Sequence, residues 1–315
     1  MAQLTEMEIR DLAFKTTGQR KNAGWMEARR GRLTASNFGK AISAMNNPHS
    51  TNIQRLREDI FNPRKLDNIP AIKWGTDHEA EAIDQYAKRM KVVVKPTGLW
   101  LFPNGVMGAT PDALVFKAAN DKVPVGIREV KCPYSIRNYP VGSFMEWHRH
   151  LKYLDCKGDL KSGTPYWHQV QGQMHAVNVE WCHFFIWTPH DCLTTQVEKD
   201  KYWLKEYFFP MEQFFKNHLA RKEDCDEMEW NAVEADSLDD YPKFSNPQPE
   251  RNLSSIIHPI GPACHHLREH MINTFQFHMT RMIYEMLTNS RSWIKRSKAV
   301  AEFWPRVVES LCEVC

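Results

Sequence analysis

The fold class is decided by a stretch that begins with Gly108-Ala109-Thr110-Pro111-Asp112-Ala113-Leu114 and ends with Val125-Gly126-Ile127-Arg128-Glu129-Val130-Lys131-Cys132-Pro133. Glu129 and Lys131 stand two residues apart in a run typical of a strand, so their side chains point to the same face. Asp112 lies near the end of the preceding strand of a hairpin, where strand pairing can bring it beside Glu129. The stretch therefore predicts two carboxylates and an ammonium group on one face of a sheet.

Two carboxylates are costly to bury together unless a cation lies between them. Mg²⁺ is such a cation, because it binds one or two carboxylates together with water and substrate phosphates. A lysine at this place, such as Lys131, can orient or deprotonate an attacking water. The competing interpretation is an ordinary ion pair between Glu129 and Lys131 on a solvated strand, but the apolar residues around them favour burial.

Helix and strand signals alternate on both sides of this stretch. Thr34 or Ser36 is expected to cap a helix that runs through residues 38–45, and apolar side chains at 3–4-residue spacing predict a long helix over 74–90. The remaining expected elements are strands over 92–102, 106–116, 123–132, 181–187 and 194–198, and helices over 166–179 and 202–219. This order predicts an α/β or α+β domain in which helices pack against a sheet.

Length and charge distribution indicate how the chain is divided. The 315 residues, with a formal net charge of +3, fit one large domain and a smaller part. Residues 223–240 carry many acids and no base, and a segment rich in chain breakers follows, so we expect a solvated linker over 222–255. The predicted parts are a domain over 1–221, this acidic, proline-containing linker, and a helical C-terminal region over 256–315.

Several classes of protein are excluded by composition. The chain has no apolar run of membrane-spanning length, and its first thirty residues do not have the pattern of a secretory signal peptide. Its eight cysteines are spread through the sequence, as is typical of reduced, buried thiols. We therefore expect an intracellular protein of the cytoplasm or nucleus, neither secreted nor bound to a membrane.

Five blocks of sequence resemble, in the same order, the lambda exonuclease / YqaJ-type viral recombinase family of the PD-(D/E)xK nuclease superfamily. The blocks are WMEAR (25–29) with RLTAS (32–36), WGTDHE (74–79), GATPDAL (108–114), EVKCPY (129–134) and YWHQVQGQM (166–174). The resemblance implies a restriction-endonuclease-like core, in which a central mixed sheet is flanked by helices. The helical C-terminal region would be an appendage to that core.

The resemblance also implies roles for individual residues. The implied metal ligands are Glu79, Asp112, Glu129 and the backbone carbonyl of Val130. Lys131 resembles the catalytic lysine, and Gln169 a glutamine that assists at the active site, so the implied catalytic residues are Asp112, Glu129, Lys131 and Gln169. The competing interpretations are that Glu79 is an acid in the first turn of its helix, where the helix dipole favours it, and that Gln169 is a polar residue on an exposed face.

Arg29, Ser36 and Thr110 match the positions that bind a 5′-terminal phosphate in the family. A guanidinium group binds phosphate bidentately and hydroxyl groups donate to it, so the residue types fit this role. The competing interpretations are that Ser36 is a plain helix cap and Arg29 a solvated base. The sequence departs from the family pattern at Thr110, Ala113 and Gln173, where the family or the wider superfamily often has serine, glycine and tyrosine.

The family's activity implies a metal-dependent deoxyribonuclease that degrades linear double-stranded DNA from 5′-phosphorylated ends in the 5′-to-3′ direction. Mg²⁺, with Mn²⁺ as a substitute and two ions per site, would be the cofactor. The product would be a 3′ single strand for an annealing protein, in recombination or DNA processing, and a ring-shaped trimer is the implied assembly. The alternatives are a DNA-binding or recruitment module without turnover, and an endonuclease or nickase on the same core.

Two further groups of residues have more ordinary interpretations. Trp147, Tyr153, Tyr166 and Trp167 could stack on unwound bases, but aromatic side chains more often fill cores. A Cys/His patch around Cys264 and a terminal Cys312-Glu313-Val314-Cys315 suggest zinc only weakly, because the spacing of standard zinc sites is missing.

Overall fold

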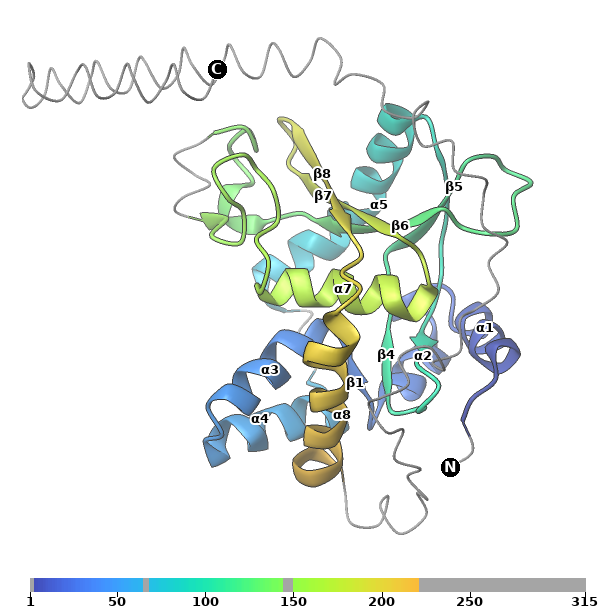
Figure 1. Cartoon of the computed structure of the whole chain (residues 1–315). Helices are drawn as coiled ribbons and strands as arrows, with labels where there is room; N and C mark the ends of the chain where they lie inside the picture. The colour runs from blue at the N-terminus through green and yellow to red at the C-terminus, as the bar shows by residue number, and fades with distance from the viewer. Residues whose placement is uncertain (1–2, 65–67, 144–149, 221–315) are drawn as a thin grey trace, which may run out of the picture. The chain divides into compact units, whose positions relative to one another are not determined.

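The computed structural model describes residues 3–64, 68–143 and 150–220 of the chain (Figure 1). The predicted linker over 222–255, the predicted helical region over 256–315 and the Cys/His patch near Cys264 lie outside the described residues, as does Trp147. All elements below belong to the domain predicted over 1–221. None of the helices in the described ranges has the length and apolar character needed to cross a bilayer.

A five-stranded mixed sheet organises the described part of the chain (Figure 1). In spatial order its strands are β2 (Val93–Lys95), β5 (Ala113–Phe116), β6 (Gly126–Lys131), β7 (Trp181–Trp187) and β8 (Cys192–Glu198). β6 and β7 pair in parallel, whereas the other neighbouring strands pair antiparallel. The predicted α/β class, with a central mixed sheet flanked by helices, is therefore confirmed.

Helices cover both faces of this sheet. They are α5 (Pro70–Met90) and α7 (Pro165–Val177). On one face, α5 packs Tyr86 in a cluster with Val130 of β6, and on the other, α7 packs Met174 in a cluster with Ile127 of the same strand. Because successive side chains of a strand point to opposite faces, Glu129 and Lys131 share the α7 face with Ile127, and Arg128 lies on the α5 face.

A smaller sheet of three strands corrects one prediction. In spatial order its strands are β1 (Leu33–Thr34), β4 (Met107–Ala109) and β3 (Trp100–Leu101). The predicted strands over 92–102 and 106–116 are each divided between this sheet and the larger one. The second run divides at Thr110-Pro111-Asp112, where Pro111 has no N–H to donate to a strand ladder. The first run divides at Thr97-Gly98, next to the first helix.

That first helix explains why glycine stands at position 98. It is α1 (Glu6–Lys15), capped by Thr5, whose hydroxyl accepts from the backbone N–H of Glu8. A Cβ atom on Gly98 would lie 2.4 Å from the carbonyl oxygen of Ala13 and 2.2 Å from the hydroxyl of Thr16. The backbone at position 98 therefore passes the end of α1 too closely for any side chain.

Three further helices follow, of which the second matches the helix predicted through residues 38–45 and the other two were not predicted. They are α2 (Ala23–Arg29), α3 (Phe38–Asn46) and α4 (Ser50–Phe61). Neither Thr34 nor Ser36 caps α3, because a 3₁₀ turn over Ala35–Asn37 precedes it and places Asn37 at the cap. The hydroxyl of Ser36 is therefore not used by a helix end.

The long helix α5 begins four residues earlier than predicted, at Pro70. Proline is favoured in the first helical turn, because its missing N–H has no partner there anyway. As a consequence, Glu79 lies in the middle of α5, and the interpretation of Glu79 as a first-turn acid is wrong.

The last described segment is helical as predicted, but it is irregular. It consists of α8 (Phe209–Phe214) between π-helical turns over Leu204–Phe208 and Phe215–Leu219. Pro210 has no N–H and cannot make a regular helical bond to an earlier carbonyl. β8, in turn, begins at Cys192, two residues before the predicted strand.

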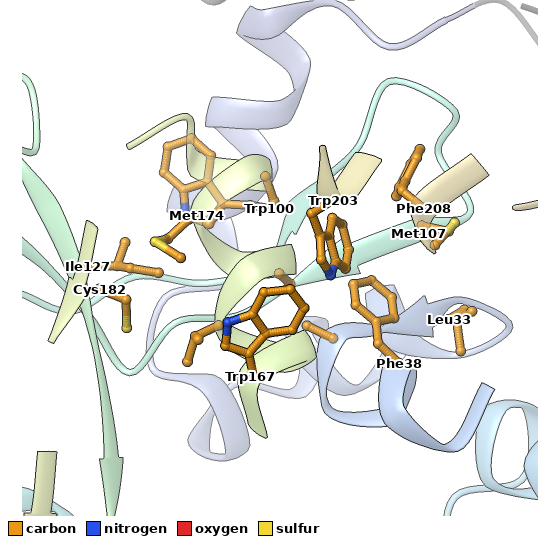
Figure 2. Packing of buried hydrophobic residues seen from close by; sticks show 14 of the residues in the cluster. Leu33, Phe38, Trp100, Met107, Ile127, Trp167, Met174, Cys182, Trp203 and Phe208 are labelled. Atoms are coloured by element: carbon orange, nitrogen blue, oxygen red, sulfur yellow. The ribbon is translucent and has the colours of Figure 1, made fainter. Parts of the chain in front are cut away.

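The main core lies between α7 and the N-terminal and C-terminal helices, and it includes Trp167 of α7 together with Phe38 and Trp203 (Figure 2). Gly172 of α7 allows this packing, because a Cβ atom there would lie 2.3 Å from a ring carbon of Phe38. Trp167 is 8% exposed, and the structure therefore supports its interpretation as a core residue. Tyr153 and Tyr166 are partly buried and pack against this core.

Two histidines of α7 make the stability of this core depend on pH. His168 accepts a hydrogen bond from Trp203 Nε1 at 3.2 Å, and His175 Nε2 lies 2.9 Å from the carbonyl oxygen of Asp200. Burial lowers the pKa of each from 6.5 to about 4. The unfolded chain therefore takes up protons before the folded one does, and stability is lost as the pH falls from about 6.5 towards 4, by roughly 3 kcal/mol for each histidine.

Urea unfolding at pH 7.5 and pH 4.5 measures this effect. We expect His168→Gln to reduce the loss of stability between the two pH values, whereas the same change at the exposed His190 leaves it as in the wild type. An unchanged pH dependence in His168→Gln would contradict the assignment of His168 as a neutral core residue.

Candidate active site

The candidate active site is built around Glu129, on the face of β6 that α7 covers. Only 2% of Glu129 is exposed, yet both of its carboxylate oxygens have partners. Oε1 accepts from Lys131 Nζ at 2.6 Å and from Gln169 Nε2 at 2.6 Å, and Oε2 accepts from Gln173 Nε2 at 2.7 Å. These three side chains therefore fix the orientation of the Glu129 carboxylate. Glu129 and Lys131 form the ion pair of the competing interpretation, but this pair is largely buried and does not lie on a solvated strand face.

Gln169 and Gln173 reach Glu129 because they lie one turn apart on α7. Gln169 is partly buried and bound to Glu129, so the interpretation of Gln169 as an exposed polar residue does not hold. Gln173 was noted in the sequence only as a departure from a family pattern. Its position four residues after Gln169 is the signal that could have placed it beside the same carboxylate.

Asp112 lies beside β6, as strand pairing predicts. Its Oδ2 accepts from the backbone N–H of Val130 at 2.7 Å. Burial raises the pKa of Asp112 well above its ordinary value, and the negative charges of Glu129 and Glu79 raise it further. The surroundings of the Asp112 carboxyl group therefore disfavour its ionised form.

Glu79 approaches from α5 and is partly buried. Burial raises its pKa, and repulsion from Glu129 adds to the effect. Burial and nearby negative charge thus disfavour the ionised forms of Asp112 and Glu79, which is the situation that a bound cation relieves.

Lys131 and Arg128 supply the positive charge of the site. Burial lowers the pKa of Lys131, but the charge of Glu129 outweighs that effect and leaves the pKa raised, so the ammonium group stays protonated. Its Nζ also lies 4.5 Å from the ring centre of Tyr166. Arg128 is 0% exposed, with its guanidinium carbon 5.0 Å from the ring centre of Tyr86.

The nitrogens of Arg128 make no hydrogen bond within the described residues. Burial lowers the pKa of Arg128, and the negative charge of Asp112 opposes this decrease. No role was predicted for Arg128 from the sequence. The sequence feature that could have drawn attention to Arg128 is a basic residue within a strand as apolar as β6.

The oxygen ligands of this site fit Mg²⁺ or Mn²⁺. In the ranges that the structure describes, no three His, Cys, Asp or Glu side chains form a group that could hold a metal ion by themselves. Mg²⁺ does not require such a group, since it keeps several waters and binds one or two carboxylates and the substrate's phosphate. Asp112 and Glu129, with Glu79 and the Val130 carbonyl, are oxygen donors of the kind it prefers.

The three residues predicted to bind a 5′-phosphate lie close together, and Trp25 connects them. Arg29 donates to Ser36 Oγ at 3.4 Å, and its guanidinium carbon lies 4.3 Å from the ring centre of Trp25. Trp25 Nε1 donates to Thr110 Oγ1 at 3.1 Å. We call Arg29, Ser36 and Thr110 the phosphate cluster. Trp25 stands in the first block of the resemblance, but nothing in the sequence indicated that it contacts Thr110.

The electrostatics of the phosphate cluster suit an anion. Arg29 is partly buried, contrary to the interpretation of a fully solvated base. Burial lowers its pKa to about 10, and the nearby charge of Arg20 contributes to the decrease. Arg29 therefore remains a cation at neutral pH. A bound anion would offset the cost of burying its charge and the repulsion from Arg20. Thr34 adds a further hydroxyl oxygen, 3.5 Å from Ser36 Oγ.

Comparison with solved structures finds exonucleases and a DNA complex. An alkaline exonuclease from Laribacter hongkongensis is 22% identical, with 61% of this chain and 89% of that chain covered and a TM-score of 0.44. A phage-related exonuclease from Haemophilus somnus 129PT is 14% identical, with coverage of 58% and 89% and a TM-score of 0.40. The structure of a SOX–DNA complex is 12% identical, with coverage of 71% and 73% and a TM-score of 0.46.

Comparison with curated proteins finds no match. Comparison with protein families finds one, over residues 24–180. These residues include the whole phosphate cluster and every side chain described around Glu129. The chain therefore carries a YqaJ-like viral recombinase domain.

Proposed function

We propose that this chain is a metal-dependent deoxyribonuclease that degrades linear double-stranded DNA from 5′-phosphorylated ends. The observation that carries the proposal is the short segment Thr110-Pro111-Asp112. Its first residue belongs to the phosphate cluster and its last accepts a hydrogen bond from β6 next to Glu129. A DNA end bound at the phosphate cluster would therefore have its nearby phosphodiester bonds beside Asp112 and Glu129. Membership in the recombinase family supports the broader class of nucleases that act on DNA.

Each group of the site has a chemical task in this proposal. Asp112 and Glu129, with Glu79 and the Val130 carbonyl, would hold Mg²⁺ or Mn²⁺, and two ions per site is the arrangement that the family implies. Bound there, the cation would supply a Lewis acid that stabilises negative charge on the phosphate during hydrolysis. Lys131 carries a positive charge at the same place and would orient the attacking water. Gln169 holds the carboxylate of Glu129 in position.

End recognition follows from the phosphate cluster. A terminal phosphate offers oxygens that a guanidinium group binds bidentately, and Ser36 and Thr110 offer hydroxyl donors. A 5′-hydroxyl end lacks these oxygens and would lose the contact. Digestion from the 5′ end would leave a 3′ single strand, which suits an annealing partner in recombination or DNA processing. The ring-shaped trimer remains a prediction from the resemblance.

The experiment that tests the proposal compares three DNA substrates in the presence of Mg²⁺. They are linear duplex with 5′-phosphate ends, linear duplex with 5′-hydroxyl ends, and covalently closed circles, each with an EDTA control. Shortening of the phosphorylated duplex alone is the expected result. Cutting of circles would instead indicate an endonuclease or nickase, and binding without cleavage would indicate a DNA-binding module without turnover.

Arg29→Ala should weaken the preference for phosphorylated ends. Because a charged hydrogen bond of this kind contributes about 1.5–3 kcal/mol, we expect the ratio of kcat/KM on 5′-phosphate DNA to that on 5′-hydroxyl DNA to fall by about tenfold or more. Arg30→Ala is the matched control, since Arg30 is the exposed neighbour and pairs only weakly with Glu27, at 3.8 Å. An equal ratio in the wild type and Arg29→Ala would argue against the phosphate cluster.

A further inference from the structure

Gln173 donates hydrogen bonds both to Glu129, where the cation would bind, and to Thr110, which belongs to the phosphate cluster. It is 0% exposed, and its single amide nitrogen donates to Glu129 Oε2 at 2.7 Å and to the carbonyl oxygen of Thr110 at 3.2 Å. An amide nitrogen has two hydrogens, so both bonds can be made at once. The amide oxygen of Gln173 has no hydrogen-bond partner within the described residues. Donation by the nitrogen is therefore what orients this side chain.

Thr110, in turn, is held from two sides. Trp25 binds its hydroxyl group and Gln173 binds its carbonyl group. Two residues further on, the carboxylate of Asp112 is fixed by the backbone of Val130. A displacement of Thr110 would therefore be opposed by both neighbours, and through Gln173 it would act on the carboxylate of Glu129.

We propose that Gln173 is a positioning residue that couples binding of a 5′-terminal phosphate at the phosphate cluster to binding of a divalent cation at Glu129. This inference rests on the proposed nuclease function, and it goes further by naming the side chain that makes one event favour the other. When a phosphate contacts Thr110, the shared amide holds Glu129 in a single orientation before the cation arrives. Such coupling is reciprocal, so the cation favours the phosphorylated end to the same extent.

The test measures Mn²⁺ affinity by electron paramagnetic resonance, a signal that does not require turnover. The protein is saturated with duplex DNA that carries either a 5′-phosphate or a 5′-hydroxyl, with phosphorothioate linkages near the ends to slow cleavage. For the wild type we expect Mn²⁺ to bind about tenfold more tightly with the phosphorylated duplex, within the usual range of such coupling. In Gln173→Met this ratio should fall to about one, because methionine fills the space without an N–H donor.

Gln171→Met is the matched control. Gln171 lies on the same helix, is also 0% exposed, and makes two hydrogen bonds, but these go to Glu198 and Asp200, away from the site. Gln171→Met should therefore lose stability and yet keep the tenfold ratio. If Gln173→Met does not fold, Gln173→Asn serves instead, because its shorter amide creates no clash and cannot span both acceptors.

Each outcome has one meaning. A wild-type ratio of one, or a ratio unchanged by replacement of Gln173, would overturn the coupling, even if the wild type cleaves phosphorylated DNA with Mg²⁺. A wild type that binds DNA and Mn²⁺ with the expected ratio but never cleaves would leave the coupling in place and refute the proposed nuclease function.

Discussion

Asp112→Asn is expected to lower the rate of DNA cleavage by about 10³-fold or more, because it removes a negative charge at the place where the cation would bind. At pH values above 7, the same change should raise the melting temperature of the metal-free protein. The asparagine oxygen can still accept the bond from the Val130 N–H, so the local structure is retained. Its neutral amide also ends the repulsion by Glu129 and Glu79 that raises the pKa of Asp112.

The sign of the stability effect follows from proton binding. Because the pKa of Asp112 is higher in the folded than in the unfolded protein, its contribution to stability is present at low pH and is lost as the pH rises through the folded value. The gain from Asp112→Asn should therefore appear on the alkaline side and disappear in acid.

Thermal unfolding in EDTA at several pH values, together with single-turnover cleavage, measures both effects. Asp121→Asn is the control, because the Asp121 carboxylate also accepts one backbone N–H, from Ala118 at 2.8 Å, in a hairpin away from the site. Normal cleavage by Asp112→Asn would refute the assigned site. Lower stability in EDTA would contradict the electrostatic account of Asp112.

Lys131→Met is expected to lower cleavage by about 10²–10⁴-fold, while DNA binding changes little. The change removes the ammonium group that lies 2.6 Å from Glu129 Oε1 and with it the charge that would act on the water and the phosphate. Glu129 keeps its bonds from Gln169 and Gln173, so its carboxylate should stay in place.

Single-turnover kinetics and a DNA-binding assay separate the two effects of Lys131→Met. Lys95→Met is the control: Lys95 lies on β2 of the same sheet, 4.2 Å from the ring centre of Phe116, and is bound to the carbonyl oxygen of Asp121. Both variants lose a lysine packed on an aromatic ring, but only Lys131→Met should lose cleavage. Equal activities would mean that Lys131 has no part in the chemistry.

Local patterns predicted much of this fold. The apolar spacing that marks α5 and α7, and the apolar runs that become β6 and β7, depend on residues close together in the sequence. The pairing of Asp112 with the region of Glu129 could also be predicted, because consecutive strands of a hairpin lie side by side. The first residue of an element was predicted wrongly where a single residue determines it, as Pro70 does at the start of α5.

Contacts between distant segments could not be predicted from the sequence. The runs over 92–102 and 106–116 have the same apolar character throughout, so nothing in their pattern shows that each changes sheet. Gln173 and Trp25 each lie more than sixty residues from Thr110, and only the packing of α7 and α2 against this segment brings them to it. The residues that connect the phosphate cluster with Glu129 are therefore found in the structure alone.

The most direct test of the central claim is the digestion of a 5′-phosphorylated linear duplex by the wild-type protein with and without Mg²⁺. The account predicts progressive shortening from the 5′ ends that requires the cation, stops in EDTA and is absent in Asp112→Asn. DNA binding without any cleavage in Mg²⁺ or Mn²⁺, or cleavage that continues in EDTA, would contradict it.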